Sequence, residues 1–113
     1  MKPTLKLIST TLLAAATLTL SAQSLAADEY LITIKDHKFE PAEIKVPVGQ
    51  KIKLVVHNQD QTPEEFESHD LNREKVVLGG KKITLSIGPL KAGSYGFMGE
   101  FNQETAKGRI IAE

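Results

Sequence analysis

Acidic side chains, one histidine and one methionine in two stretches of this 113-residue chain are its best candidates for metal chemistry. The first stretch contributes Glu65, Glu67 and His69, and the second contributes Met98 and Glu100. Carboxylates with one imidazole suit iron, manganese or Cu(II), whereas a methionine thioether paired with an imidazole favours copper. These residue types predict a metal site in which the five side chains are ligands of a copper or iron ion.

The spacing within the first stretch supports this prediction. If Phe66 points into a core, strand alternation places Glu65 and Glu67 together on the opposite face, with His69 as a further member. Glu64 and Glu104 are additional acids in the same two stretches. The alternative is that these are ordinary solvated loops and that Met98 only fills space in the core.

Other kinds of chemistry find less support. The chain has no cysteine, so it offers neither a thiolate ligand nor a thiol nucleophile. No Ser/His/Asp arrangement can be placed, and the neighbouring carboxylates come without the long cleft that a polysaccharide substrate needs. His37 and His57 read as exposed turn or strand residues. We therefore expect no catalytic residues.

The N-terminal segment has the features of a secretory signal peptide. Lys2 and Lys6 precede an apolar stretch, and Ser24-Leu25-Ala26 offers small residues where a signal peptidase cuts. We expect residues 1–26 to be removed and residues 27–113 to form one periplasmic domain. Removal of residues 1–26 would take away two of the 14 basic residues and none of the 14 acidic ones, which leaves the remaining domain with a charge of −2. That charge favours neither nucleic acid nor membrane as a partner, and no second apolar span follows for membrane insertion.

Short alternating runs separated by turn residues predict an all-β fold. The runs are residues 30–35, 43–46, 51–58, 76–78, 82–87, 94–98 and 107–112. The acidic segment 59–71 reads as irregular, and no long stretch shows helical periodicity. About seven short strands at regular spacing indicate a Greek-key β-sandwich.

The order of apolar and turn residues resembles the cupredoxins. The matching positions are Phe39-x-Pro41-x-x-Ile44-x-Val46-x-x-Gly49-x-x-Ile52-x-Leu54 and Asn58 in the first half, with Gly88-Pro-Leu-x-x-Gly93-x-Tyr95-x-Phe97 and Lys107-Gly108-x-Ile110 in the second. The resemblance implies a sandwich of two sheets, with a metal site where the loop after residues 51–58 meets the 99–106 loop.

The four copper ligands that this resemblance implies are replaced here. Glu64 stands at the first histidine position and Gly99 at the cysteine position, while Asn102 and Ala106 stand near the second histidine and the methionine. A type 1 blue-copper centre needs the thiolate. We therefore expect no type 1 copper, and a replaced rather than a decayed site.

A second resemblance concerns the acidic segment. Phe66-Glu-Ser-His-Asp-Leu-Asn-Arg-Glu-Lys-Val-Val77, with Gly99-Glu-Phe and Thr105-Ala-Lys-Gly108, is similar to the small periplasmic cupredoxin-like proteins of bacterial ferrous iron uptake systems, the EfeO-type group. The resemblance implies a metal-handling accessory whose partners are a permease or a periplasmic binding component. It also implies the one enzymatic alternative, which is assistance to the oxidation of ferrous iron. The alternative is a metal-free cupredoxin-fold module that docks on a permease or on a metal-loaded partner.

Overall fold

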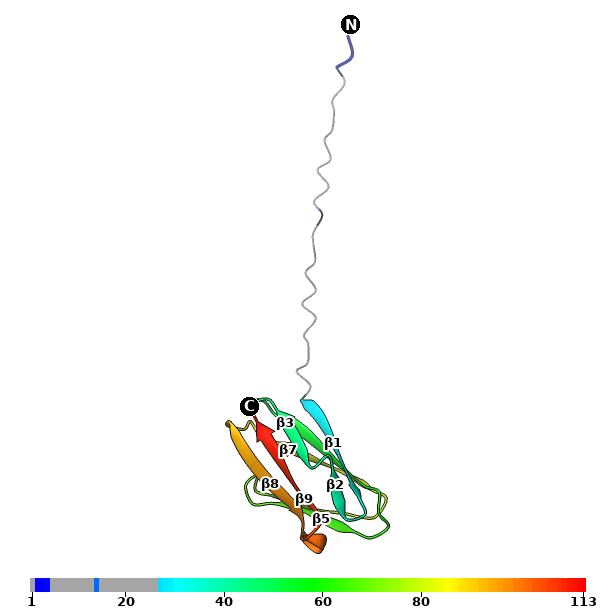
Figure 1. The fold of residues 1–113 in the computed structure, drawn as a ribbon. Coiled ribbons are helices and arrows are strands. Elements are labelled where there is room, and N and C mark those ends of the chain that lie inside the picture. The colour runs from blue at the N-terminus through cyan, green and yellow to red at the C-terminus, as the bar shows by residue number, and fades with distance from the viewer. Residues whose placement is uncertain (1, 5–13, 15–26) are drawn as a thin grey trace.

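Nine strands and one short 3-10 turn make up the described part of the computed structural model, which comprises residues 2–4, 14 and 27–113 (Figure 1). In chain order they are β1 (Asp28–Lys35), β2 (Lys38–Glu40), β3 (Glu43–Val46), β4 (Ile52–Asn58), β5 (Glu64–Ser68), β6 (Arg73–Val77), β7 (Lys82–Ile87), β8 (Gly93–Gly99), η1 (Glu100–Asn102) and β9 (Lys107–Ala112). No helix in these ranges is long and apolar enough to span a membrane. Most of the predicted signal peptide lies outside the described residues, so cleavage after Ala26 stays a prediction.

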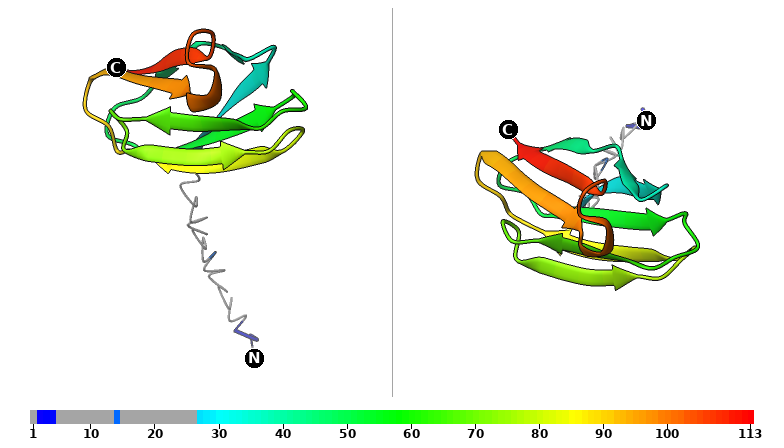
Figure 2. Two further views of the ribbon diagram at one scale, coloured as in Figure 1. Left: turned by 90° about the horizontal axis from the view of Figure 1, so that it is seen from below. Right: turned by 60° about the horizontal axis from the view of Figure 1, so that its bottom comes forward.

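The strands form two facing sheets, which confirms the predicted β-sandwich (Figure 2). One sheet has the order β2-β1-β4-β7 and the other has the order β3-β9-β8-β5-β6. Both sheets are mixed, because β1 runs parallel to β4 and β3 runs parallel to β9. The sheets bury their apolar faces against each other, as in other aligned sandwiches.

Strand alternation explains the core. Ile32 and Ile34 of β1 are buried while their neighbours on the strand are more exposed, and the same pattern repeats along β9. Phe39, Phe66 and Phe97 meet at the centre, with ring centroids 5.0 to 6.2 Å apart. Edge-to-face and offset contacts of this kind add to the stability gained from burying the rings.

The prediction that residues 59–71 are irregular is wrong in its second half. Residues 64–68 form β5, which lies between β8 and β6 inside the larger sheet. The alternation of apolar residues does not reveal this strand, because only one of its three inward positions is apolar. These positions are Glu64, Phe66 and Ser68. The two polar members are buried but hydrogen-bonded, which makes their burial tolerable.

The end of the sandwich near η1 is also built from polar contacts. Asn58 closes β4 and is fully buried, and its side-chain amide donates to the carbonyls of Thr62 and Val77 at 2.8 and 3.1 Å. Its carbonyl oxygen accepts from the backbone N–H of Asp60 at 3.0 Å. These bonds fix the course of the chain from β4 into β5 and so set where the acidic strand begins.

Candidate metal site

The outer face of the larger sheet carries the predicted site residues in one neighbourhood. Within the sheet, Glu67 of β5 lies directly opposite Glu74 of β6 on one side and Met98 of β8 on the other. Met98 in turn lies opposite Lys107 of β9. Phe66 is buried and Glu65 and Glu67 are half-buried on the opposite face, as strand alternation predicts.

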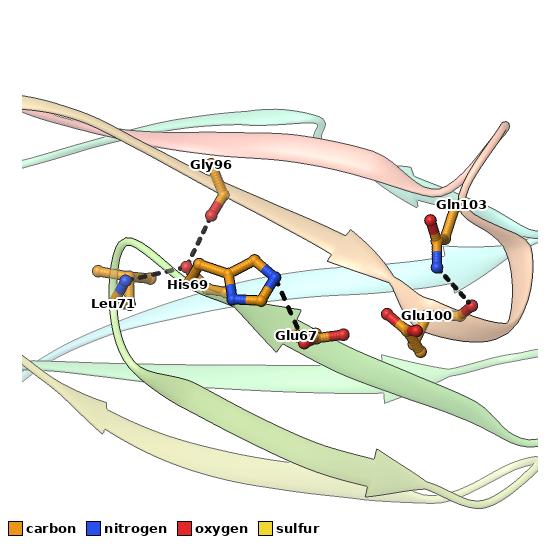
Figure 3. A network of polar contacts seen from close by, with 7 residues as sticks. Glu67, His69, Leu71, Gly96, Glu100 and Gln103 are labelled. Atoms are coloured by element: carbon orange, nitrogen blue, oxygen red, sulfur yellow. Dashed lines mark hydrogen bonds and ion pairs between the residues drawn. The ribbon is translucent and has the colours of Figure 1, made fainter.

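Glu67 is the centre of this arrangement (Figure 3). Its carboxylate lies between the side chains of His69 and Glu100, and His69 Nε2 stands 3.5 Å from Glu67 Oε1. The hydrogen bond between the carboxyl groups of Glu67 and Glu100 raises the pKa of Glu67, and desolvation and the charge of Glu100 act in the same direction. The His69 side chain is 80% exposed and the Glu67 side chain only 17%, so His69 is free to reorient toward an ion held by Glu67.

A second carboxyl pair extends the cluster. The protonated carboxyl group of Glu65 donates a hydrogen bond to Glu74, and this bond, desolvation and the charges of Glu74, Glu67 and Glu100 together raise the pKa of Glu65 to about 7. None of these four carboxylates forms a salt bridge with a lysine or arginine of residues 27–113. Acidic groups that lie close together without a lysine or arginine partner can be neutralised by protons or by a metal cation.

An open groove of about 600 Å³ runs beside this cluster, between the turn after β5 and the loop before β9. Glu67, His69 and Met98 line it together with Glu104 and Lys107. The turn is fixed to β8 because Ser68 Oγ donates to the Gly96 carbonyl at 2.6 Å and Asp70 accepts from the Gly96 N–H at 2.9 Å. The groove therefore places an imidazole and a thioether on the side of Glu67 away from Glu65.

The position where the fold resemblance implies copper holds a different arrangement. Glu64 is buried with 2% exposure, and its carboxylate accepts from the Phe101 N–H at 2.8 Å and from Asn102 Nδ2 at 2.6 Å. A Cβ atom on Gly99 would lie 2.6 Å from Glu64 Cδ and 2.7 Å from the Cβ of Ala106. There is no room for a cysteine at residue 99, so a thiolate copper centre does not fit the residues present.

The surface carboxylates fit a metal ion better, although only as pairs in their present rotamers. No three His, Asp or Glu side chains in the described ranges converge well enough to hold an ion as they stand. Glu67 with Glu100, and Glu67 with His69, are the close combinations. Binding would require rotation of side chains on a solvent-facing surface, and their role as ligands stays a prediction.

Two parts of this geometry were missed from the sequence. Glu74 was not a candidate, yet its register against Glu67 and its pairing with Glu65 put it inside the cluster. A hairpin with its turn at residues 69–72 would have revealed it, and Asn72, with a φ of 52°, marks that turn. The contact between Glu64 and Asn102 joins residues 38 positions apart, and local pattern carries no signal for it.

Comparison with known proteins decides the family. The family model described as "Cupredoxin-like domain" matches residues 8–112. The chain belongs to the cupredoxin-like family. The match reaches into the predicted signal peptide and so does not mark where that peptide ends. The uncharacterized protein RP394 of Rickettsia prowazekii is 54% identical over 83 residues, which cover 74% of this chain and 66% of the relative.

Solved cupredoxin structures share the fold at low identity. Auracyanin A, a "blue" copper protein of Chloroflexus aurantiacus, has a TM-score of 0.68 and 11% identity over 78% of this chain and all of its own. The metal binding domain of the Cu(I) exporting ATPase CopA of Streptococcus pneumoniae has a TM-score of 0.68 and 14% identity, over 75% of this chain and 84% of its own. Amicyanin of Paracoccus versutus has a TM-score of 0.60 and 18% identity, over 80% of this chain and 86% of its own. These likenesses establish the sandwich, and the chemistry rests on the residues of this chain.

Proposed function

We propose that this protein handles a metal ion, copper or iron, on the outer face of its larger sheet. The observation that carries the proposal is the placement of Glu67, whose carboxylate lies between the side chains of His69 and Glu100 and which is opposite Met98 in the sheet. The pKa values of Glu65 and Glu67 are raised first by hydrogen bonds to neighbouring carboxyl groups, then by desolvation and by the charges of nearby acids, and a cation there would offset this last contribution.

The donor set fits ions that tolerate more than one kind of ligand. Glu65, Glu67 and Glu100 supply hard oxygen atoms, which suit iron and Cu(II), and His69 supplies an imidazole that both ions accept. Met98 adds a soft donor from the groove side. The surface position leaves part of the coordination sphere open to solvent or to a partner, as expected for an ion that is delivered and handed on.

In physiological terms, we propose a periplasmic accessory of a bacterial iron uptake system, of the EfeO type. The support is the resemblance of residues 66–77, which supply Glu67, His69 and Glu74, to that group. Carboxylates also stabilise Fe(III) relative to Fe(II), which suits a site that accepts iron as it is oxidised. The electron acceptor would be a partner protein or a bound copper ion, because the chain has no thiolate copper centre of its own.

Titration calorimetry of the metal-free protein with Cu(II), and separately with ferric citrate, tests the site. The triple variant Glu67→Gln/His69→Ala/Glu100→Gln should abolish the binding signal. The variant Glu29→Gln is a matched control, since Glu29 pairs with Lys53 on the other sheet at 3.8 Å. An isotherm unchanged in the triple variant would refute the assigned residues.

A second candidate function is a docking module that holds no metal itself. Phe101 and Leu78 are exposed by 52% and 60%, and Val76, exposed by 47%, lies opposite Glu65 in the sheet. Apolar side chains bordering carboxylates suit a permease or a metal-loaded partner with basic and apolar groups. Cross-linking in cells distinguishes the two functions, because docking alone survives the triple variant and is lost in Phe101→Ser.

A further inference from the structure

We propose that Glu64 is a positioning residue, which holds η1 against β5 so that Glu100 stands beside Glu67. This inference rests on the proposed function, because it explains how the two ligands from different elements are kept together. Glu64 itself faces the core and takes no part in the surface cluster.

The hydrogen bonds of Glu64 use both of its oxygen atoms. Oε1 accepts from the N–H groups of Glu65 at 2.9 Å and Phe101 at 2.8 Å, while Oε2 accepts from Asn102 Nδ2 at 2.6 Å. Gly99 precedes η1 and has no side chain to cap it. The acceptor for the Phe101 N–H therefore comes from another strand, and a charged acceptor makes the stronger bond.

Asn102 connects this contact to the whole loop. Its backbone carbonyl accepts from the N–H of Ala106 at 2.8 Å and of Thr105 at 3.2 Å. The N–H of Gly99 donates to the Ala106 carbonyl at 2.9 Å and closes the loop at its base. The side chain of Asn102 therefore adds to the Phe101 N–H a second bond between this closed loop and Glu64 of β5.

The position of Glu100 follows from these bonds. Glu100 is the residue between Gly99, which packs against Glu64, and Phe101, whose N–H is bound by Glu64. Its side chain leaves the turn on the outer face, where it meets Glu67. Loss of the Glu64 contacts removes the two bonds that hold Phe101 and Asn102 against β5, and Glu100 is then held less firmly beside Glu67.

Exchanging the carboxylate and the amide between Glu64 and Asn102 tests the positioning role of Glu64 with side chains of nearly unchanged size. Asn102→Asp sets a second carboxylate against that of Glu64, and the two repel. In the double variant Glu64→Gln/Asn102→Asp, the new amide at position 64 donates to the new carboxylate at position 102, and its carbonyl oxygen still accepts from the Phe101 N–H. Glu64→Gln alone is the conservative control, because the amide of Asn102 can turn over and accept. The proposal therefore expects a defect in Asn102→Asp that the double variant repairs.

Hydrogen exchange and Cu(II) binding, both measured at about pH 8, report the defect in Asn102→Asp and its repair in the double variant. In Asn102→Asp, hydrogen exchange at the Phe101 amide should accelerate, and the Cu(II) dissociation constant should rise, each by about tenfold or more, since a buried acceptor loses its donor. Both should return to within about threefold of the wild-type values in the double variant. Exchange in the core strand β4 reports global unfolding and should change less than exchange at Phe101.

The outcomes separate this inference from the proposed function. If the wild-type protein binds Cu(II) but Asn102→Asp changes neither measurement, or the double variant repairs neither, the positioning role is refuted. If the wild-type protein binds no metal, the proposed function fails. The positioning of η1 then stands or falls by exchange at Phe101 and by the nuclear Overhauser contacts between the side chains of Glu100 and Glu67.

Discussion

At the scale of single residues, the carboxylates on β5 and their neighbours are held closer than like charges prefer. Glu67 contacts Glu100, and Glu65 contacts Glu74, and both contacts raise pKa values. Such pairs are uncommon on surfaces that only need to be solvated, because acids usually separate or find a lysine. The cost of keeping them together is what a bound cation would offset.

The first prediction concerns pH. In the folded chain Glu65 keeps its proton to about pH 7, whereas its ordinary pKa is 4.5. The folded state therefore binds more protons than the unfolded state between these values, so stability is greatest below them and falls as the pH rises through this range. Glu67, whose pKa is also raised, acts in the same direction. Thermal unfolding followed by circular dichroism should show a midpoint that declines from about pH 5 to about pH 8.

The variant Glu74→Gln provides the control for this pH dependence. It removes the largest cause of the shift at Glu65, so the decline in the midpoint should become shallower. A wild-type midpoint that rises over the same pH range would show that these carboxyl pairs do not form.

The second prediction concerns Gly99. Replacement by alanine or cysteine should destabilise the fold by about 1–3 kcal/mol, because the new side chain would overlap Glu64 and Ala106. Gly96→Ala on the same strand is the matched control, since its Cβ would meet only Asp70 Oδ2 at an ordinary 3.6 Å. Urea unfolding measures both variants. A stable Gly99→Cys protein that binds copper and turns the blue of a type 1 centre would contradict the conclusion that residue 99 has no room for a cysteine.

At the scale of elements, β5 is the strand on which the site depends. It lies between β6 and β8, so its outer residue Glu67 has Glu74 on one side and Met98 on the other, while Glu65 lies opposite Val76 of β6. Its end is fixed by Ser68, whose hydroxyl donates to the Gly96 carbonyl and accepts from the N–H of Leu71. Because His69 follows Ser68 directly, this fixed end sets the position of the His69 backbone.

The third prediction is that Ser68→Ala weakens this anchor. Two hydrogen bonds of a buried hydroxyl are lost, and the expected cost is about 1–3 kcal/mol. Cu(II) affinity should fall as well, because the turn that carries His69 loosens. Ser94→Ala, an exposed position on β8, is the control and should behave like the wild type. Equal stability and affinity in the two variants would argue against the anchor.

The same strand shows how far the sequence can be taken. Strands with alternating apolar residues were predictable, and so was the common face of Glu65 and Glu67 once Phe66 was assigned to the core. β5 was missed because polar residues occupy two of its three inward positions, and their burial depends on partners distant in the chain. Glu74 was missed for the related reason that its place depends on strand register.

At the scale of the whole molecule, the chain keeps the cupredoxin-like fold, and its candidate metal ligands lie at a different position from the one that the resemblance implies. The end of the sandwich where the resemblance implies a copper site is here occupied by the contact between Glu64 and Asn102. The candidate ligands lie on the adjacent sheet face, where solvent or a partner can reach them. Under the proposed function, the cupredoxin-like sandwich would support a metal site on its surface.

The fourth prediction concerns export. The protein recovered from the periplasm should begin at Ala27, because the signal peptide features end at Ala26. Intact mass spectrometry of the periplasmic fraction measures this directly. Recovery of the complete chain from the membrane fraction alone would contradict the predicted processing.

The most direct measurement of the central claim is the location of a bound paramagnetic ion. Met98 is the one methionine besides Met1, so its methyl group gives a single nuclear magnetic resonance signal after processing. With less than one equivalent of Cu(II), signals near the surface site should broaden first, namely the Met98 methyl signal and the amide signals of Glu67 and Glu100. The methyl signal of Ala106, which is buried beside Gly99, should broaden only later. Broadening of Ala106 with Met98 unaffected, or no broadening at all, would contradict the surface site.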